Sequence, residues 1–489
     1  MDLTQSSTLS GSSEGVRNPV RKSGRPGLLI GTQSAILQNY LYPVLIKRAR
    51  PTSPRYLKEL HEFEFASPEA VERAQWAKLQ KLIVHAAQNV PYYRNAFRRY
   101  GIRPDEIRNR EDFARVPVLR KFDVQSSCEE LISENRDRKS GTRNATGGST
   151  GKPVQFYQDG EYWDQAHACQ TFVEEWWGIK PGDRTASLWG ADRDIPDQSW
   201  RERMYSEIVQ LRVCNAFALR SSQMDEFRKM LVRWQPRHVI GYASALEVFS
   251  RFLLEKGESR IRPLALKTTA DVLTDERREV IQRAFGCPVY NFYGSREINN
   301  LAVECPALEG LHVNSLFRYI EVVDEEGNPL PHGKPGRILV TDLTNYFMPF
   351  LRYEIEDIGS WSDAPCSCGR PFRLLSKIWG RSSDFIVTPE GKLIHGEYFT
   401  HMFYDVPEVM RFQLNQRSIT DVDVYVVLRP EVLDYPEALL RNRIRGALGP
   451  NVAFRLNVVS DIDRPASGKH RFTISAVRPD WSRTEVKTS

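Results

Sequence analysis

Residues 266–297 read LKTTADVLTDERREVIQRAFGCPVYNFYGSRE, and this stretch decides the fold. Leu266–Thr269 and Pro288–Phe292 are short apolar runs that are typical of buried strands, and Thr274–Phe285 between them is expected to be a helix. A strand, a helix and a second strand in this order predict two parallel neighbours in an α/β sheet.

The same alternation extends upstream of this stretch. Strands and helices are expected in turn at Arg184–Trp189, Met224–Trp234, His238–Gly241 and Ser244–Lys256. The pattern predicts a doubly wound parallel sheet, in which ligands bind beyond the carboxyl ends of the strands. Thr268–Asp271 and Phe292–Glu297 fall at such ends.

The regions around this core are expected to have other structures. Ser67–Arg99 is predicted as one helix and Tyr162–Trp177 as another, from apolar spacing close to 3.6 residues. Arg318–Val323 and Arg337–Thr341 are predicted as paired strands of a β-rich subdomain. A final α+β unit is expected from strands and a helix at Arg411–Asn415, Asp423–Val427, Pro436–Leu448 and Phe454–Val458.

These patterns give the expected organisation of the 489-residue chain. Residues 1–35 are expected to be a disordered tail, residues 36–377 a large N-terminal domain of parallel α/β layers plus the β-rich subdomain, and residues 378–489 a small mobile α+β domain. The fold class is therefore α/β.

Composition excludes several classes of function. The net charge of +6 is modest for this length and fits anionic small substrates better than nucleic acid. No apolar run is long enough for a transmembrane helix, and Met1–Gly27 lacks the apolar core of a secretory signal. Seven cysteines without such a signal predict a reducing, cytoplasmic location. Ile30–Ile46 is mildly amphipathic and precedes Lys47, so it fits an ordinary packed helix or a membrane-surface segment.

Residues 144–153 read NATGGSTGKP and form the most informative loop. Glycines let backbone N–H groups converge on a ligand, hydroxyls add donors, and a lysine adds a cation, so the loop suits a polyphosphate. Because proline follows the lysine, the Walker A pattern does not fit. Glycine and serine content alone would equally describe a flexible surface loop. The residues expected to hold phosphates are Thr146, Gly147, Gly148, Ser149, Thr150, Gly151 and Lys152.

Further short motifs follow in a fixed order. Tyr293-Gly294-Ser295-Arg296-Glu297 offers an aromatic ring for a base and a carboxylate for Mg2+. Asp357 could accept two ribose hydroxyls, since a carboxylate is an acceptor with two oxygens. Gly380–Asp384 contains Arg381, and Gly468–Arg471 contains Lys469, a point charge for a developing negative charge. Each motif alone is as well explained by a strand end or a turn.

Their order and distances together resemble the adenylate-forming, or acyl-CoA synthetase, superfamily over roughly residues 55–475. The segment Trp76–Phe97, with its Val-Pro-Tyr-Tyr-Arg sequence, and Pro349–Tyr353 resemble phenylacetate–CoA ligase-like proteins. Glu354-Ile355-Glu356 departs from the ligase pattern. With Pro389–Gly396 and Arg411–Gln416, it resembles the CapK-type branch associated with capsule and exopolysaccharide biosynthesis.

The resemblance implies a two-step reaction in which ATP and a carboxylic acid give an acyl-adenylate and pyrophosphate, and a nucleophile such as the CoA thiol then displaces AMP. It implies that Lys152, Glu297 and Lys469 are catalytic, that Glu297 binds Mg2+, and that a hinge lies between Arg370 and Arg381. The nucleotide is expected against the phosphate loop, Tyr293, Gly294, Ser295, Asp357 and Arg381.

Two alternatives stay open at this point. The acyl group could pass to an amine, a hydroxyl or a carrier protein, or the chain could be an inactive binding component of polysaccharide assembly. Relatives of this kind often form homodimers, but the sequence names no interface. The expected acyl pocket is lined by Trp189, Gly190, Tyr242, Ala270 and Asp271, and the identity of the acid is not decided.

Four residues are predicted to bind a structural zinc ion. Six residues separate Cys305 from His312, and Cys366-Ser367-Cys368 follows later. Three thiolates and one imidazole make a closed tetrahedral set of the structural kind. Four unrelated residues would be the alternative, and a similar set in some phenylacetate–CoA ligase-like proteins favours zinc.

Overall fold

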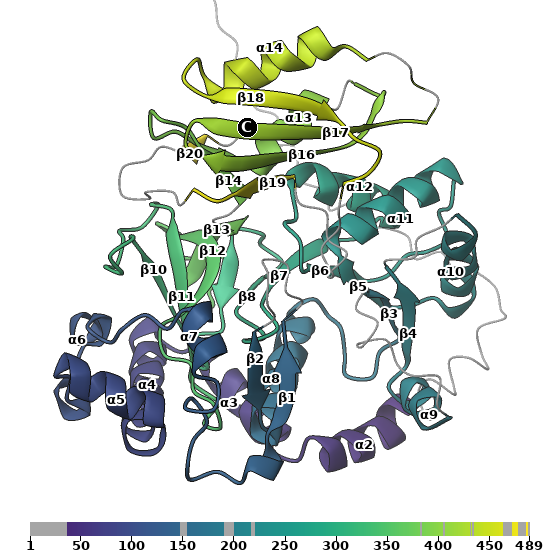
Figure 1. The fold of residues 1–489 in the computed structure, drawn as a ribbon. Helices are drawn as coiled ribbons and strands as arrows, with labels where there is room; N and C mark the ends of the chain where they lie inside the picture. Colours follow the sequence, from purple (N-terminus) through teal and green to yellow (C-terminus); the bar gives the residue numbers. More distant parts are fainter. Residues whose placement is uncertain are drawn as a thin grey trace, which may run out of the picture.

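The computed structural model describes residues 37–146, 154–189, 200–216, 221–381, 384–403, 406–430, 432, 435–462, 472–477 and 486–487. Its largest element is an eleven-stranded mixed sheet with strands in the order β10-β11-β12-β13-β9-β8-β7-β6-β5-β3-β4. Figure 1 shows this sheet below and beside the C-terminal part of the chain. The parallel half and the antiparallel half of the sheet join between β7 and β8.

The parallel half confirms the predicted α/β alternation. Its strands are β3 (Thr185–Trp189), β4 (Leu211–Asn215), β5 (His238–Tyr242), β6 (Ala265–Thr269) and β7 (Val289–Tyr293). The helices in this region are α9 (Trp200–Ile208), α10 (Ser221–Trp234), α11 (Ala243–Glu255) and α12 (Asp275–Phe285). β4 was not predicted from the sequence; it is a half-buried strand at the edge of the sheet, with Arg212 as its second residue.

Helix α12 shows how local sequence fixes these elements. The hydroxyl of Thr274 accepts a hydrogen bond of 3.1 Å from the backbone N–H of Arg277, which caps the first turn. The helix ends at Gly286, whose φ of +63° is a left-handed conformation that favours glycine. β7 then begins three residues later and carries the chain to the motif at Tyr293.

The antiparallel half contains the predicted β-rich region, but as part of the same sheet and not as a separate one. Arg318 pairs with Asp342 and Val323 with Arg337, which confirms the predicted hairpin. The strands of this half are β8 (Ala302–Glu304), β9 (Leu311–Val313), β10 (Arg318–Val323), β11 (Gly336–Asp342), β12 (Tyr353–Trp361) and β13 (Leu374–Arg381).

The prediction of one helix over Ser67–Arg99 is wrong, because the structure has two. Pro91 has no N–H to continue the helix, and the preceding Val90 is extended with φ −115° and ψ 110°. The helical elements of this region are η1 (Leu37–Leu41), α2 (Tyr42–Ala49), α3 (Ser53–Phe63), α4 (Pro68–Asn89), α5 (Pro91–Tyr100), η2 (Pro104–Glu106), α6 (Arg110–Ala114), α7 (Lys121–Ser126) and η3 (Arg138–Ser140).

A hairpin and a long helix follow, and of these the sequence had predicted the helix. The hairpin consists of β1 (Thr142–Ala145) and β2 (Gln155–Gln158), and α8 (Gly160–Trp176) begins two residues after it. The carboxylate of Asp159 caps α8 by accepting a 2.9 Å hydrogen bond from the N–H of Tyr162. α8 buries one face against α3 and the sheet, in a cluster that contains Phe172 and Phe292.

The C-terminal part of the chain has its own core, which includes Leu414, Val424, Leu440 and Ile444. One sheet orders its strands β18-β17-β16-β19 and a second orders them β14-β15-β20. Figure 1 shows this part next to the ends of β12 and β13. Its elements are β14 (Phe385–Val387), β15 (Leu393–His395), α13 (Gly396–Phe403), β16 (Val409–Ser418), β17 (Asp421–Leu428), α14 (Glu437–Leu448), β18 (Ala453–Val458), β19 (Thr473–Ser475) and β20 (Val486–Lys487).

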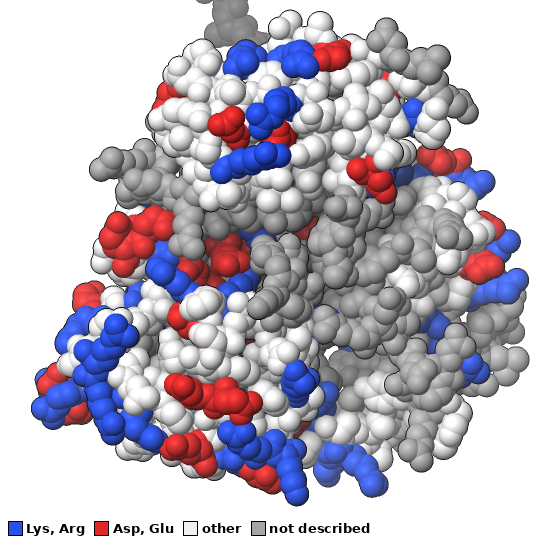
Figure 2. All heavy atoms as spheres, in the orientation of Figure 1, with Lys and Arg blue, Asp and Glu red and all other residues white. Residues whose placement is uncertain are grey.

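Charges of both signs are mixed over the face in Figure 2, and lysine and arginine side chains gather along its lower edge. Among the described helices, none has the length and apolarity needed to cross a lipid bilayer.

Candidate functional site

Two tyrosine–carboxylate pairs, one half-buried and one buried, form the centre of the candidate site. Tyr293 ends β7, and its hydroxyl donates a 2.8 Å hydrogen bond to Oδ2 of Asp357 in β12. Asp357 in turn lies opposite Arg381 in the β12–β13 register. Burial raises the pKa of Asp357 above its usual range, and the nearby Arg381 guanidinium opposes this rise. Three residues that the sequence predicted to bind a nucleotide are thus neighbours.

The second pair joins Glu297 to Tyr353. The Tyr353 hydroxyl donates a 2.9 Å hydrogen bond to Oε1 of Glu297, whose side chain is almost fully buried. Burial raises the pKa of Tyr353 well above its usual range, and the charge of Glu297 adds to this effect, so the hydroxyl stays a donor. Sequence reasoning missed Tyr353 as a site residue, although it stands in the quoted Pro349–Tyr353 motif.

The turn between these pairs is held by its own residues. The backbone N–H of Ser295 donates to the carbonyl of Ile298 at 3.0 Å, and the Ser295 hydroxyl accepts from the N–H of Ile298 at 3.1 Å. A Cβ atom on Gly294 would lie 3.2 Å from the backbone nitrogen of Asn300. Gly294 and Ser295 therefore shape the loop that presents Tyr293 and Glu297.

The predicted phosphate loop starts beside this turn. Thr146 closes the loop's base, since its N–H donates to the carbonyl of Val154 at 2.9 Å and its hydroxyl accepts from the N–H of Val154 at 3.0 Å. Gln158 donates from Nε2 to the carbonyl oxygens of Arg296 (3.2 Å) and Glu297 (3.0 Å). Gly147, Gly148, Ser149, Thr150, Gly151 and Lys152 lie outside the described residues.

The expected acyl-pocket residues lie at the carboxyl ends of neighbouring parallel strands. The rings of Trp189 and Tyr242 are 5.1 Å apart, and the Ser244 hydroxyl donates a 2.5 Å hydrogen bond to Asp271. Ala270 has a φ of +72°, a backbone conformation that is uncommon outside glycine. Gly190 and Lys469 lie outside the described residues.

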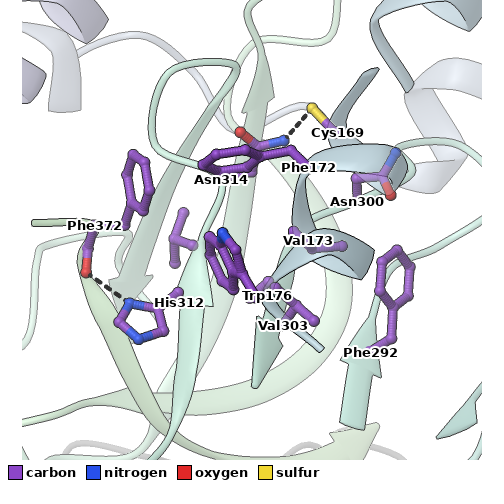
Figure 3. A pocket seen from close by; sticks show the side chains of 12 residues that line it. Cys169, Phe172, Val173, Trp176, Phe292, Asn300, Val303, His312, Asn314 and Phe372 are labelled. Carbon is purple, nitrogen blue, oxygen red and sulfur yellow. Dashed lines mark hydrogen bonds between the residues drawn. The ribbon is translucent and has the colours of Figure 1, made fainter. Parts of the chain in front are cut away.

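A small cavity lies between α8 and strands β7 to β9 (Figure 3). Phe292 borders it on the side of the Tyr293 motif, and His312 borders it on the other. Its lining is mostly apolar, but the buried Oδ1 of Asn300 reaches no hydrogen-bond partner among the described residues. The expected acyl pocket shares no residue with this cavity.

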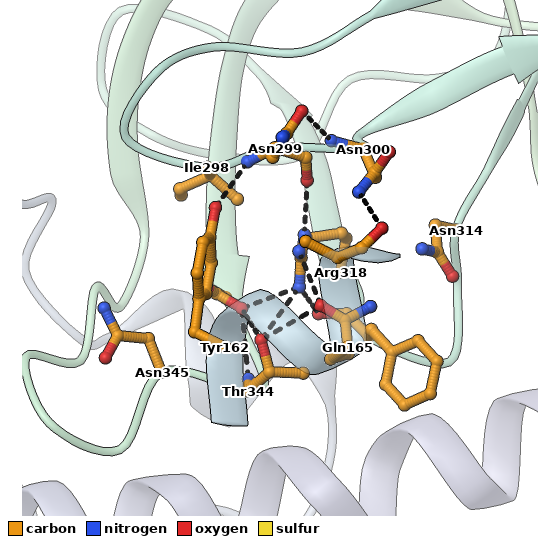
Figure 4. Close-up of polar contacts among 12 residues, drawn as sticks. Tyr162, Gln165, Ile298, Asn299, Asn300, Asn314, Arg318, Thr344 and Asn345 are labelled. Carbon is orange, nitrogen blue, oxygen red and sulfur yellow. Dashed lines mark hydrogen bonds and ion pairs between the residues drawn. The ribbon is translucent and has the colours of Figure 1, made fainter. Parts of the chain in front are cut away.

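A buried ionic network supports the loop after Glu297 (Figure 4). Arg318 is fully buried, and its guanidinium donates to Asp342 at 2.7 Å, to Gln165 at 3.0 Å and to the carbonyl of Asn299 at 3.0 Å. The N–H of Asn299 also donates to the Tyr162 hydroxyl at 2.8 Å. The network ties α8 and β10 to the site, and no sequence motif had marked it.

The four predicted zinc ligands come together as expected. The ligand atoms of Cys305, His312, Cys366 and Cys368 all lie within 4.8 Å of one another. His312 Nε2 is 3.3 Å from the Cys368 sulfur, while its Nδ1 is 3.4 Å from the carbonyl oxygen of Phe372. One ring nitrogen thus faces the cluster and the other faces a backbone acceptor, as in metal-binding histidines.

The residues that depart from the ligase pattern are paired with cations of the same chain. Glu354 accepts a 2.7 Å hydrogen bond from Arg337, and Glu356 forms an ion pair with Lys121. Arg352 is buried, bonds to Glu321 at 3.1 Å and donates to three backbone carbonyls. Arg352 itself therefore serves packing, and the charges of Glu354 and Glu356 are compensated locally.

Known proteins are similar to this chain in sequence and in architecture. A sequence profile for the CapK C-terminal domain matches residues 386–476. Protein CapK of Staphylococcus aureus is 25% identical over 373 residues, covering 74% of this chain and 80% of that protein. A phenylacetate-coenzyme A ligase of Thermus thermophilus is 25% identical over 430 residues, covering 81% and 94%. A crystal structure of 2-hydroxyisobutyryl-CoA ligase in the postadenylation state superposes with a TM-score of 0.67 at 19% identity, covering 84% and 91%.

The fold is therefore that of the adenylate-forming acyl-CoA ligases, as the sequence motifs predicted. Within this class, CapK and the phenylacetate-CoA ligases are homologous to the chain, and its C-terminal part resembles that of CapK.

Proposed function

We propose that this chain is an ATP-dependent ligase that activates a carboxylic acid as an acyl-adenylate and then passes the acyl group to a nucleophile, with the CoA thiol as the favoured acceptor. One observation carries the proposal: the Tyr293–Asp357 and Tyr353–Glu297 pairs lie together beside the base of the 146–154 loop. The phenylacetate-CoA ligase relatives and the acyl-CoA ligase fold support it.

The reaction has two displacements. In the first, a carboxylate oxygen of the acid attacks the α-phosphorus of ATP, the bond to the β-phosphate oxygen breaks, and pyrophosphate leaves. In the second, the thiol sulfur attacks the acyl carbon, the bond to the AMP oxygen breaks, and the thiol proton goes to solvent. Neither step needs a covalent enzyme intermediate, so positioning and electrostatics supply the catalysis.

In this proposal, different described residues bind the ribose, the adenine and the Mg2+ ion of the nucleotide complex. Asp357 accepts the ribose hydroxyls, and Arg381 beside it favours the ionised carboxylate that this role needs. Tyr293 lies by the adenine and fixes Asp357 through its hydroxyl. Glu297 would hold Mg2+, which neutralises phosphate charge when bound, and Tyr353 orients this carboxylate.

The remaining catalytic roles rest on sequence. Lys152 and the glycines and hydroxyls of the 146–151 stretch would bind the β- and γ-phosphates, and Lys469 would stabilise the charge that develops during adenylation. Trp189 and Tyr242 would form an aromatic wall of the acyl pocket, and Ala270 and Asp271 would line it beside them. Gly190 is assigned to the same pocket from the sequence alone.

The domain boundary belongs to the same proposal. β13 stays paired with β12 up to Arg381, four residues beyond the boundary at residue 377 that the sequence suggested. We therefore place the hinge after Arg381. A rotation there would carry Lys469 with the small domain while Arg381 keeps its place opposite Asp357.

A structural zinc ion fits the Cys305, His312, Cys366 and Cys368 cluster, because three thiols and one imidazole converge and His312 is oriented by a backbone carbonyl. It would join the connection between β8 and β9 to the connection between β12 and β13. His312 of this cluster lines the same cavity as Phe292, which precedes Tyr293. Zinc would therefore stabilise the structure next to the site and take no part in the chemistry.

Carboxylate-dependent exchange of pyrophosphate into ATP tests adenylation across aryl, fatty, amino and sugar acids. Exchange with one acid class that falls at least 100-fold in Lys469→Ala and Glu297→Gln is expected. No exchange with any acid, in folded protein that binds ATP, would favour an inactive binding component. Acceptor assays with CoA, amines, saccharide hydroxyls and a carrier-protein thiol then separate CoA ligation from transfer into an envelope polysaccharide, which the CapK likeness suggests.

A further inference from the structure

The first described helical segment exposes part of its apolar surface. Gln38 and Tyr42, four residues apart, face the protein: Gln38 donates to the carbonyl of Pro181 at 3.1 Å, and the Tyr42 hydroxyl lies 3.4 Å from the His167 ring. Tyr40 and Val44 occupy another face of the same helix and are 70% and 68% exposed. Leu45 and Ile46 are half-buried, so the segment carries apolar side chains on an outward face in addition to those that pack against the protein, whereas a packed surface helix normally has a polar outer face.

A second helix adds apolar side chains at the same edge of the molecule. α9 contacts η1, although about 160 residues separate them, and Figure 1 shows α9 and α2 near each other at the lower edge. Trp200 and Met204, one turn apart in α9, are 68% and 52% exposed. We name this surface, made of Tyr40, Leu41, Val44, Trp200, Met204 and Tyr205, the apolar edge.

Positive charge is concentrated next to the apolar edge. Lys47 and Arg48 are exposed in the last turn of α2. The described sequence from Leu37 to Lys58 contains five lysines and arginines and neither aspartate nor glutamate. Figure 2 shows lysine and arginine side chains along the same lower edge.

We propose that the apolar edge and the adjoining Lys47 and Arg48 dock the protein on the surface of an anionic lipid membrane. Tryptophan and tyrosine prefer the headgroup region, where the ring is buried and the polar atom stays hydrated. Each basic residue near such a surface adds attraction to the anionic headgroups. The helix would lie in the plane of the interface and would not cross it.

A second copy of the chain fits this surface less well. A two-fold symmetric contact places the same patch on both partners, so Lys47 and Arg48 of one copy would approach those of the other. Like charges at a contact are unfavourable, whereas phosphate headgroups complement them.

Vesicle co-sedimentation of the full-length protein tests the proposal. Wild type is expected to bind vesicles of phosphatidylcholine with one third phosphatidylglycerol in 0.1 M salt, and to bind pure phosphatidylcholine vesicles at least 10-fold more weakly. Binding is expected to fall steeply in 0.5 M salt, because the Debye length shortens. The doubles Tyr40→Ser/Val44→Ser and Lys47→Gln/Arg48→Gln should each lower the partition coefficient on the order of 10-fold.

Two controls separate docking from loss of structure. Val248→Ser/Leu439→Ser removes two exposed apolar side chains elsewhere, 47% and 42% exposed, and should bind vesicles as wild type does. Pyrophosphate exchange should be unchanged in all three doubles. Equal binding of the Tyr40→Ser/Val44→Ser double and wild type would overturn the proposal. A second result would also overturn it: wild type that does not bind vesicles but is a dimer by light scattering, while the Tyr40→Ser/Val44→Ser double is a monomer.

Discussion

The hydrogen bond from Tyr353 to Glu297 gives the sharpest test of the site. Tyr353→Phe removes one hydroxyl and keeps the ring, which packs against Phe350 with the centroids 4.8 Å apart. A hydrogen bond to a charged group contributes about 1.5–3 kcal/mol net, and burial of both side chains favours the upper part of this range. Glu297 would then lose a fixed orientation as well as a donor.

The expected result is a selective change in magnesium dependence. Loss of a side chain that orients a metal ligand typically lowers metal affinity or activity 10- to 100-fold. We expect the Mg2+ concentration for half-maximal pyrophosphate exchange to rise at least 10-fold in Tyr353→Phe. The free energy of unfolding without ligands should fall by about 1.5–3 kcal/mol in the same variant.

Tyr93→Phe is the matched control. The Tyr93 hydroxyl is also buried, donates to the carbonyl of Pro349 at 3.1 Å and accepts from the N–H of Leu351 at 2.9 Å. This variant should lose stability without a change in magnesium dependence. An unaltered Mg2+ requirement in Tyr353→Phe, or an equal shift in both variants, would refute the assignment of Glu297 as the magnesium ligand.

Three further results are expected. Elemental analysis should find one zinc per chain in the wild type and none in Cys366→Ser, which should also melt several degrees lower. Cys128→Ser, at a half-exposed cysteine, should keep the zinc content and the melting temperature of the wild type. Full zinc content in Cys366→Ser would exclude the cluster as the zinc site. Burial lowers the pKa of His238 to about 4, so unfolding takes up a proton below pH 6.5, and stability should fall by about 2 kcal/mol from pH 7 to pH 5. Urea titrations of His238→Gln should show a smaller fall, and the exposed His332→Gln should match wild type. Burial raises the pKa of Asp357, so this carboxylate becomes protonated at a higher pH than an ordinary aspartate does. As the pH is lowered, the KM for ATP should therefore begin to rise at that higher pH, and Asp357→Asn should have a high KM at every pH.

Much of the fold could be predicted from local sequence. Leu266–Thr269 and Thr274–Phe285 were placed within one residue of β6 and α12, because buried strands and capped helices have clear local patterns. The division of Ser67–Arg99 was also readable, since Pro91 stands inside the predicted helix. β4 was missed because an edge strand of five half-buried residues has no such pattern.

From the sequence, only those residues of the site could be predicted that belong to recognisable motifs. Tyr293, Asp357 and Arg381 were expected together, and they are neighbours. Arg318 and Tyr353 were not expected in the site. Arg318 depends on Asp342 and Gln165, which are 24 and 153 residues away in the sequence, and Tyr353 depends on Glu297, 56 residues away. No local sequence pattern reveals such distant partners. Buried polar networks of this kind become visible only when the contacts themselves are known.

The buried hydrogen bonds of Arg318 explain how the loop after Glu297 is held in place. Arg318 is fully buried, and its charge is stable there only because Asp342, Gln165 and backbone carbonyls satisfy it. Removal of one partner of a buried pair typically costs about 3–5 kcal/mol, so Asp342→Asn should loosen the loop through Asn299. A weaker Arg318 network would therefore raise the KM for both ATP and the acid, although neither touches Arg318. Unchanged kinetics in a destabilised Asp342→Asn protein would show that the network supports the fold and not the site.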